Sequence, residues 1–268
     1  MSDSRARRLS IPGQFPAIDV NAGQLAPFWR SHVLWPLGLM ALAFILIESL
    51  GLDQKVTNAL YFNHATQQWL GAGAGDWLAH RLIHTGGTWM IRGIAALALV
   101  TWILTFFVPA MRHWRRSSGF IVLAMAASVL VVGGLKLVTN VDCPWDLTEY
   151  GGSHPYVALF ADRPDYLPRA QCFPGAHASS GFALVAFYFA LRNRRRRLAL
   201  LALGSACLVG VVFAIAQEAR GAHFISHDLT SAMLVWVIQL YLYVRVLGLP
   251  AVPARAPLMA GTTAGSQA

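Results

Sequence analysis

The chain has 268 residues, of which 56% are hydrophobic and only 12% are charged, and its mean hydropathy is +0.50. A soluble globular domain carries about 25% charged residues, so this composition argues against a soluble fold and favours an integral membrane protein. The net charge of +9 would favour nucleic-acid binding in a soluble protein. Here the arginines cluster in short segments between apolar runs, so membrane topology explains them and we expect no nucleic-acid partner.

Apolar segments of membrane-spanning length follow one another along most of the chain. Residues 1–30 are a predicted cytoplasmic arm, and residues 249–268, rich in Ala, Gly, Pro and Ser, are a predicted disordered cytoplasmic tail. Residues 31–248 contain six segments near the roughly 20 residues that a helix needs to cross a bilayer. The sequence therefore predicts an all-α, polytopic membrane protein with six transmembrane helices. The expected spans are Val33–Gly51, Trp89–Val108, Gly119–Val138, Ser180–Leu191, Leu198–Ala216 and Leu229–Leu247.

Two of these regions need a further comment. The fourth span is short, and we expect its helix to begin within Pro174–Ser179. Between the first two spans, residues 54–88 mix aromatic, glycine and polar residues, which indicates an amphipathic helix on the outer leaflet.

The basic residues predict the orientation of the chain in the membrane. They lie before the first span, between the second and third, between the fourth and fifth, and at the end of the sixth. These regions alternate along the chain and so share one side, which the positive-inside rule makes the cytoplasm. Both termini are then cytoplasmic, and loops 52–88, 139–178 and 217–228 face outward. The residues concerned are Arg5, Arg7, Arg8, Arg112, Arg115, Arg116, Arg192, Arg194, Arg195, Arg196, Arg197 and Arg245.

Two polar clusters lie where the chain leaves the apolar spans on the outer side. The first, Phe173–Ser179, contains His177, and the second, Arg220–Asp228, contains two further histidines. Ionisable groups at the edge of an apolar bundle are costly, so they form a functional hypothesis by default. Together with Lys136, near the outer end of the third span, they predict a site that binds phosphate and attacks it with an imidazole.

The first cluster has the features of an anion site. Gly175 and Ala176 are small and allow a close approach of the backbone to a ligand. A helix that begins near His177 would direct free N–H groups and its positive dipole end at an anion. Ser179 is expected to cap this helix or to donate a hydrogen bond.

The second cluster offers a phosphate ligand and a nucleophile. The Arg220 guanidinium matches phosphate oxygens in a bidentate manner. His223 is a candidate nucleophile, provided that a neighbour orients its ring and stabilises the imidazolium. Asp228 is chemically the better partner, because a carboxylate fixes the tautomer and favours the positive charge. His227, four residues after His223, remains the alternative.

The order of these motifs resembles the type 2 phosphatidic acid phosphatase superfamily. Its signature is Lys-x6-Arg-Pro, then Pro-Ser-Gly-His, then Ser-Arg-x5-His-x3-Asp, and the resemblance covers about residues 118–248. It implies a phosphatidic acid phosphatase/haloperoxidase-type helical bundle with an outward-facing site. The positions that match are Lys136, Pro144, Pro174, His177 and His223.

The departures from this signature indicate a divergent branch. Cys143 stands at the arginine position of the first motif, and Gly175 replaces the serine of the second. In the third motif Gln217 occupies the arginine position, with Arg220 three residues before the histidine. The acid position holds His227, and Asp228 follows one residue later.

The resemblance implies a mechanism without a metal or a cofactor. His223 attacks phosphorus and forms a phosphohistidine, and His177 protonates the leaving oxygen and then activates water. Lys136 and Arg220 stabilise the equatorial oxygens of the transition state. We expect Arg169 or Arg163, from the outer loop, to substitute for the arginine that is missing at position 143.

The resemblance also implies a class of substrate and a compartment. The expected substrate is a lipid-linked phosphate or diphosphate at the periplasmic face of a bacterial inner membrane. Candidates are undecaprenyl diphosphate, phosphatidylglycerol phosphate, phosphatidic acid and lipid A. The alternatives are a phosphotransferase, for example onto lipid A, and a lipid-binding or transport protein that has lost hydrolysis. If the motifs converge, Cys143 and Cys172 come close, and the oxidising periplasm favours a disulfide between them.

Overall fold

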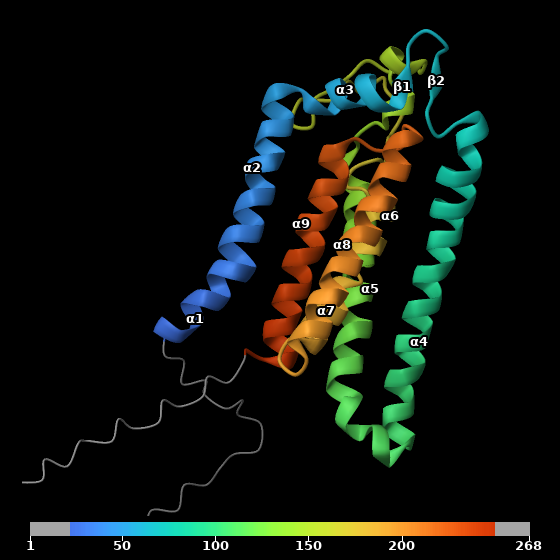
Figure 1. Cartoon of the computed structure of the whole chain (residues 1–268). Helices are drawn as coiled ribbons and strands as arrows, with labels where there is room; N and C mark the ends of the chain where they lie inside the picture. Colours follow the sequence, from blue (N-terminus) through green and yellow to red (C-terminus); the bar gives the residue numbers. More distant parts are fainter. Residues whose placement is uncertain (1–21, 250–268) are drawn as a thin grey trace, which may run out of the picture.

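The computed structural model describes residues 22–249 as a bundle of long, roughly parallel and antiparallel helices (Figure 1). Residues 22–30 of the predicted arm are helical, and the rest of that arm and residues 250–268 of the predicted tail lie outside the described residues. The main helices are α1 (Ala22–Trp29), α2 (Trp35–Leu50), α4 (Gly87–Phe107), α5 (Arg115–Thr139), α6 (Ala176–Phe182), α7 (Val185–Leu191), α8 (Arg196–Ala219) and α9 (Ile225–Leu242).

The remaining elements connect these helices. Most are 3₁₀ or π-helical segments, and one is a two-stranded antiparallel hairpin in which Phe62 pairs with Trp69. In chain order they are η1 (Arg30–Leu34), α3 (Leu52–Val56), η2 (Thr57–Tyr61), β1 (Phe62–Asn63), β2 (Gln68–Trp69), η3 (Gly73–Gly75), η4 (Trp77–Gly86), η5 (Pro109–Trp114), η6 (Pro144–Asp146), η7 (Thr148–Tyr150) and η8 (Tyr243–Leu247).

Five helical stretches of the described chain are long and apolar enough to cross a membrane. The expected count of six is not confirmed, because the helix of the fourth expected span, Ala176–Leu191, is shorter than these. It is interrupted between α6 and α7, and residues such as Ala183 and Phe189 are almost fully buried. A helix enclosed by other helices has less need to match the thickness of the bilayer, which accounts for its length. The five stretches are Ala26–Leu50, Gly73–Phe107, Pro109–Asp146, Arg196–Ala219 and Ile225–Leu247.

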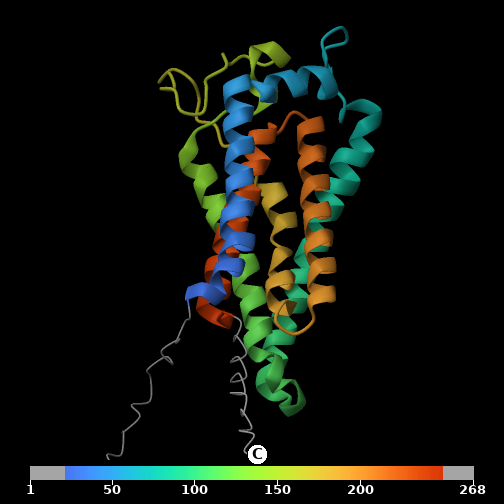
Figure 2. The ribbon, with the colours of Figure 1, turned by 60° about the vertical axis from the view of Figure 1, so that its left-hand side comes forward.

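The core of the bundle lies among α5, α6, α7, α8 and α9, which pack against one another. Small residues allow close helix contact: a Cβ on Gly181 of α6 would lie 2.9 Å from the Cα of Gly210 on α8. Outside this core, α2 and α4 flank the bundle, as two views 60° apart show (Figures 1 and 2). Their many exposed apolar side chains are those expected to face lipid.

A cap of short elements covers the end of the bundle at the top of Figure 1. Gly51, with a φ of 61°, turns the chain from α2 into α3, which lies across this end. The buried Asp53 of α3 accepts hydrogen bonds from the backbone N (3.0 Å) and Oγ (2.5 Å) of Ser226, in the first turn of α9. This carboxylate satisfies a donor that a helix start leaves free. Within residues 54–88, where an amphipathic helix is expected, the structure has η2, the hairpin, η3 and the ten-residue helical segment η4.

The described basic segments gather at the opposite end of the bundle. The connections α4–α5 and α7–α8, together with η8, all lie at the bottom of Figure 1. Arg116 joins two of these segments by donating to the carbonyl of Val246 at 2.6 Å. The expected outer loops lie at the other end, so the two ends differ in charge in the manner that the sequence predicts.

Candidate active site

The two polar clusters meet because the turn before α6 is hydrogen-bonded to the start of α9. The backbone N of Gly175 donates to the carbonyl of His227 at 3.0 Å. The Oγ of Ser231 donates to the carbonyl of Gly175 at 2.9 Å. Residues about fifty positions apart in the chain are thereby held in one backbone network.

Asp228, rather than His227, is the partner of the expected nucleophile. The Nδ1 of His223 lies 2.7 Å from Oδ1 of Asp228, and both side chains are about 97% buried. The ring centroid of His227 is 6.1 Å from that of His223, and the two rings do not hydrogen-bond to each other. A carboxylate on Nδ1 keeps the ring proton there and leaves Nε2 as the free, basic nitrogen.

The surroundings of His223 favour its neutral, nucleophilic form. Burial, followed by the positive charges of Lys136 and Arg220, lowers the pKa of His223 below its ordinary value. The imidazole is therefore uncharged at neutral pH, as a nucleophile must be.

Gly175 is required by the position of Asp228. A Cβ at Gly175 would lie 1.9 Å from Oδ1 of Asp228 and 2.8 Å from Nδ1 of His223. The serine of the family signature therefore does not fit at this position. Two departures from that signature, the glycine and the acid displaced by one residue, compensate each other, because the carboxylate fills the space that a serine side chain would need.

Stacking fixes the ring of His177, and one of its two nitrogens makes no hydrogen bond within the described residues. Its ring stacks on Phe213, with centroids 4.2 Å apart and an interplanar angle of 17°. Gly87 leaves room for this arrangement, since a Cβ there would lie 2.5 Å from the Phe213 ring. The Nε2 atom of His177 is buried and has no hydrogen-bond partner within residues 22–249. An imidazole with a free nitrogen at a buried site is suited to proton transfer with a substrate.

Sequence reasoning missed two residues that join this group. His84, in η4, has its ring centroid 4.5 Å from that of His177. Gln217, at the signature's arginine position, lies 3.0 Å from His84 and accepts a hydrogen bond from Arg220 at 2.8 Å. No motif marks His84, and Gln217 stands at a motif position only as a neutral replacement for the arginine, to which the sequence assigns no role.

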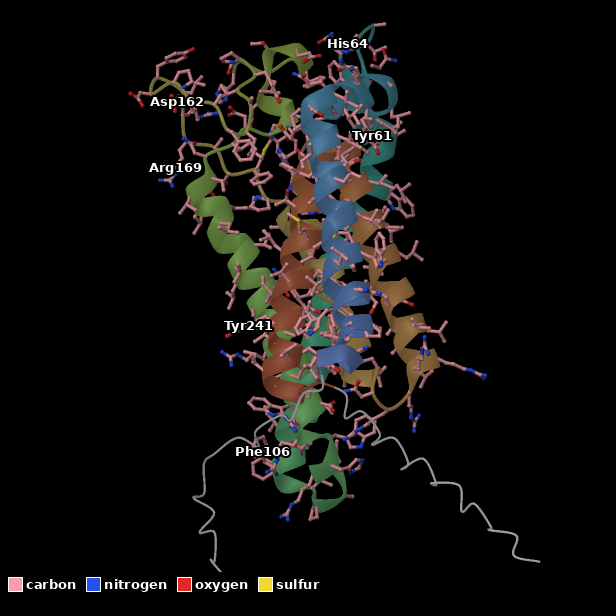
Figure 3. The ribbon with its side chains drawn as sticks, turned by 90° about the vertical axis from the view of Figure 1, so that its left-hand side faces the viewer. Tyr61, His64, Phe106, Asp162, Arg169 and Tyr241 are labelled. Carbon is pink, nitrogen blue, oxygen red and sulfur yellow. A yellow bond between two sulfur atoms is a disulfide. The ribbon has the colours of Figure 1, made fainter. Side chains whose placement is uncertain are left out.

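Three of the expected phosphate ligands make other contacts. Arg163 is held by the Asp142 carboxylate, which His154 also contacts at 2.7 Å. Arg169 donates to the carbonyl of Leu137, is exposed, and points away from the bundle (Figure 3). Neither arginine hydrogen-bonds to the His223–Asp228 pair, so their expected role in binding phosphate stays a prediction.

Ser179 is the third of these residues. It is fully buried, and its hydroxyl donates to the carbonyl of Ala176 at 2.7 Å. It therefore satisfies a backbone acceptor of its own helix rather than presenting its hydroxyl to a ligand. Ala176 itself lines the apolar groove described below.

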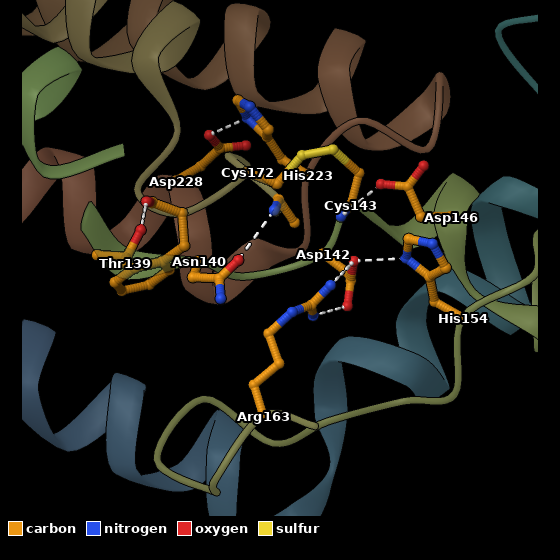
Figure 4. The surroundings of a disulfide bond; sticks show 12 residues. Thr139, Asn140, Asp142, Cys143, Asp146, His154, Arg163, Cys172, His223 and Asp228 are labelled. Atoms are coloured by element: carbon orange, nitrogen blue, oxygen red, sulfur yellow. Dashed lines mark hydrogen bonds and ion pairs between the residues drawn. A yellow bond between two sulfur atoms is a disulfide. The ribbon is translucent and has the colours of Figure 1, made fainter. Parts of the chain in front are cut away.

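Cys143 and Cys172 form a disulfide, with Cα atoms 5.1 Å apart, beside the His223–Asp228 pair (Figure 4). Two hydrogen bonds also join the two ends of the outer loop near this disulfide. One runs from Cys172 N to the Val141 carbonyl (3.0 Å), and the other from Ala170 N to Asn140 Oδ1 (2.9 Å). The two ends of the long outer loop are thus joined next to the site.

One group of possible metal ligands occurs among the described residues, formed by Cys143, Asp146 and Cys172. Their ligand atoms lie within 4.8 Å of one another. The disulfide removes both thiolates, which leaves a single carboxylate and no set of donors suited to a metal.

A buried histidine–carboxylate pair, a second imidazole and two cations at one end of an apolar helical bundle define a membrane enzyme that acts on phosphate. Residues 118–248 match the model of the PAP2 superfamily, so the chain carries a PAP2 superfamily domain. This confirms the resemblance found in the sequence and implies phosphatase-type activity on phosphate esters. No curated protein and no solved structure matches the chain.

Substitution of Gly175 by serine tests the fit between the glycine and the displaced acid. We expect Gly175→Ser to push the Asp228 carboxylate off His223 and to lower kcat/KM for phosphate release by about 100-fold, the usual cost of a misplacement of about 1 Å. Gly134→Ser is the matched control, because a Cβ there meets no atom within 4 Å. Equal activity of the two variants would show that the space beside Asp228 is not limiting.

The state of the cysteines can be measured directly. Intact-mass analysis of purified, non-reduced protein after thiol alkylation should show one modified cysteine, Cys207, which is the free cysteine among the described residues. After denaturation and reduction, all three should be modified, because Cys143 and Cys172 are then released. Modification of all three without reductant would contradict the disulfide.

Proposed function

We propose that the protein hydrolyses a phosphomonoester or diphosphate on a membrane lipid, through a phosphohistidine intermediate and without a metal. We place this reaction at the periplasmic face of a bacterial inner membrane. The lipid substrate is supported above all by one feature, an apolar groove that leads from His177 between helices α4 and α5.

The groove has a volume of about 610 Å³, within the range of sites that hold small molecules. Its walls are mainly aliphatic, with Ile91, Leu99 and Val129 among them, and its polar end carries His84, His177 and Ser180. A lipid phosphate has this same division, with a hydrocarbon tail joined to an anionic head. A soluble phosphate ester has no tail with which to fill the groove.

The site residues divide the reaction into two displacements. In the first, Nε2 of His223 attacks phosphorus, the bond from phosphorus to the leaving oxygen breaks, and His177 gives that oxygen a proton. Asp228 stabilises the imidazolium that forms. In the second, His177 takes a proton from water, the oxygen attacks phosphorus, and the P–N bond breaks to release phosphate and free His223. Lys136 and Arg220 stabilise the negative charge on the phosphoryl oxygens in both steps.

The orientation rests on the separation of charge between the two ends of the bundle. The described arginine-rich connections lie opposite the site, and the positive-inside rule assigns such connections to the cytoplasm. The site then faces the periplasm, where the disulfide beside it is stable.

Phosphate release from a panel of lipid phosphates tests the proposal. The panel contains undecaprenyl diphosphate, phosphatidylglycerol phosphate and phosphatidic acid in detergent micelles, with EDTA present. We expect the wild type to release phosphate from at least one of them and His223→Ala to lose at least about 100-fold in kcat. Wild-type turnover by that variant would overturn the mechanism. Transfer of labelled phosphate to a lipid acceptor, without free phosphate, would indicate a phosphotransferase instead.

Parallel substitutions distinguish the two candidate partners of the nucleophile. Asp228→Asn should lower kcat by about 100-fold or more, because the amide neither stabilises the imidazolium nor fixes the ring proton on Nδ1. His227→Asn, at the neighbouring position, should keep the His223–Asp228 pair and lose much less. A larger loss in His227→Asn than in Asp228→Asn would reverse the assignment.

A further inference from the structure

A hydrogen-bonded chain connects Arg220 to a histidine outside the family domain. Nη1 of Arg220 donates to Oε1 of Gln217 at 2.8 Å, and Nε2 of Gln217 lies 3.0 Å from Nδ1 of His84. His84 belongs to η4, more than thirty residues before the segment that matches the PAP2 superfamily. The family domain therefore assigns it no role.

The order of donors in this chain fixes the tautomer of His84. A guanidinium can only donate, so the amide oxygen of Gln217 faces Arg220 and its amide nitrogen faces His84. That nitrogen also only donates, so Nδ1 of His84 must be the acceptor. The proton of the neutral ring is then on Nε2, which makes no hydrogen bond to any residue between 22 and 249.

The position of His84 directs this donor toward the substrate. Its ring lies beside that of His177, and both residues line the polar end of the apolar groove. Nε2 of His177 is fully enclosed by protein, whereas Nε2 of His84 is not. A ligand that fills the groove and reaches His177 would meet this N–H.

The site also lacks donors that the family signature contains. Cys143 replaces one arginine and is bound in the disulfide, and Gln217 replaces another. Arg220 returns one cation to the site, because its hydrogen bond to Gln217 connects it to His84. The other arginine has no counterpart among Arg163 and Arg169, whose guanidinium groups are engaged by the Asp142 carboxylate and by the carbonyl of Leu137 in α5.

We propose that His84 is a phosphate-binding residue, whose Nε2–H donates to a non-bridging oxygen of the substrate phosphate while Gln217 holds Nδ1. Gln217 then holds both residues that replace the missing arginines. Its side-chain oxygen accepts a hydrogen bond from Arg220, and its side-chain nitrogen donates one to His84. This inference rests on the proposed function, because it deepens the description of the same phosphate site. A neutral donor at a transferring phosphoryl group stabilises the charge that develops there.

Two amide substitutions separate the roles of the two ring nitrogens. The amide nitrogen of glutamine can occupy the place of Nε2, so His84→Gln keeps the donor and loses the acceptor for Gln217. The shorter asparagine reaches only the place of Nδ1, so His84→Asn keeps a contact with Gln217 and loses the donor. His84→Ala loses both. His80→Ala is the matched control, because His80 lies one turn away, is about half exposed and pairs with Asp76.

The readouts are turnover of a lipid phosphate and the Kd of orthovanadate, which mimics the transition state of phosphoryl transfer. We expect His84→Asn and His84→Ala to lower kcat by about 100-fold and to weaken orthovanadate binding similarly, the usual effect of removing one positioned donor. KM should change little, since the apolar groove is intact. His84→Gln and His80→Ala should stay within a few-fold of the wild type in both measurements.

Other outcomes would overturn the inference. If His84→Asn matches the wild type and His84→Gln is impaired, His84 acts by positioning Gln217 and does not bind phosphate. If all variants bind orthovanadate as the wild type does, the ring does not contact the anion. A wild type that hydrolyses no lipid phosphate, yet binds orthovanadate with the expected dependence on Nε2, would refute the proposed function and leave the phosphate-binding role supported.

Discussion

The site depends on the junction between the turn before α6 and the first turn of α9. The backbone of Gly175 contributes both a donor and an acceptor to this junction, so its geometry is set by main-chain atoms and not by flexible side chains. One consequence is that His177, two residues further and in the first turn of α6, is held at a fixed position relative to α9. The remaining parts of the site, from α5, α8 and η4, are arranged around this junction.

The departures from the family signature make sense as coupled changes. The acid displaced by one position needs a glycine opposite it, and the loss of an arginine at position 217 accompanies an arginine at position 220. Each change alone would damage the site, through a steric overlap in the first case and a missing cation in the second. The divergent third motif therefore describes an alternative arrangement of an arginine, a histidine and an acid, while the first motif has lost its arginine to Cys143.

The sequence predicts the components of this site better than their contacts. Apolar runs and basic connections were enough to predict a helical membrane bundle with two different ends, because those signals depend on solvation alone. The spacing of His223, His227 and Asp228 does not decide the partner, because α9 begins after His223 and a turn whose geometry the sequence does not reveal separates it from both candidates. The length of the helix Ala176–Leu191 was equally undetermined, since its enclosure by neighbours is a tertiary effect.

The contacts that the sequence does not predict share one physical cause, since they form only when distant segments of the chain pack together. His84 reaches the site only because η4 continues into α4 and brings it beside α6 and α8, a contact that no local pattern encodes. Arg163 and Arg169 were plausible as free cations, but a buried carboxylate and a backbone carbonyl engage them. Unpaired charge is a property of the folded chain and cannot be read from composition.

The hydrogen bonds from Ser226 to Asp53 bear on what constitutes a functional unit of this protein. Asp53 precedes the family domain by more than sixty residues, yet it supplies the acceptor for the start of α9. A transplanted segment 118–248 would carry Asp228, the partner of His223, on a helix whose first turn had lost that acceptor. The preceding helices are thus more than a membrane anchor, and modular exchange between relatives should keep them with the domain that they complete.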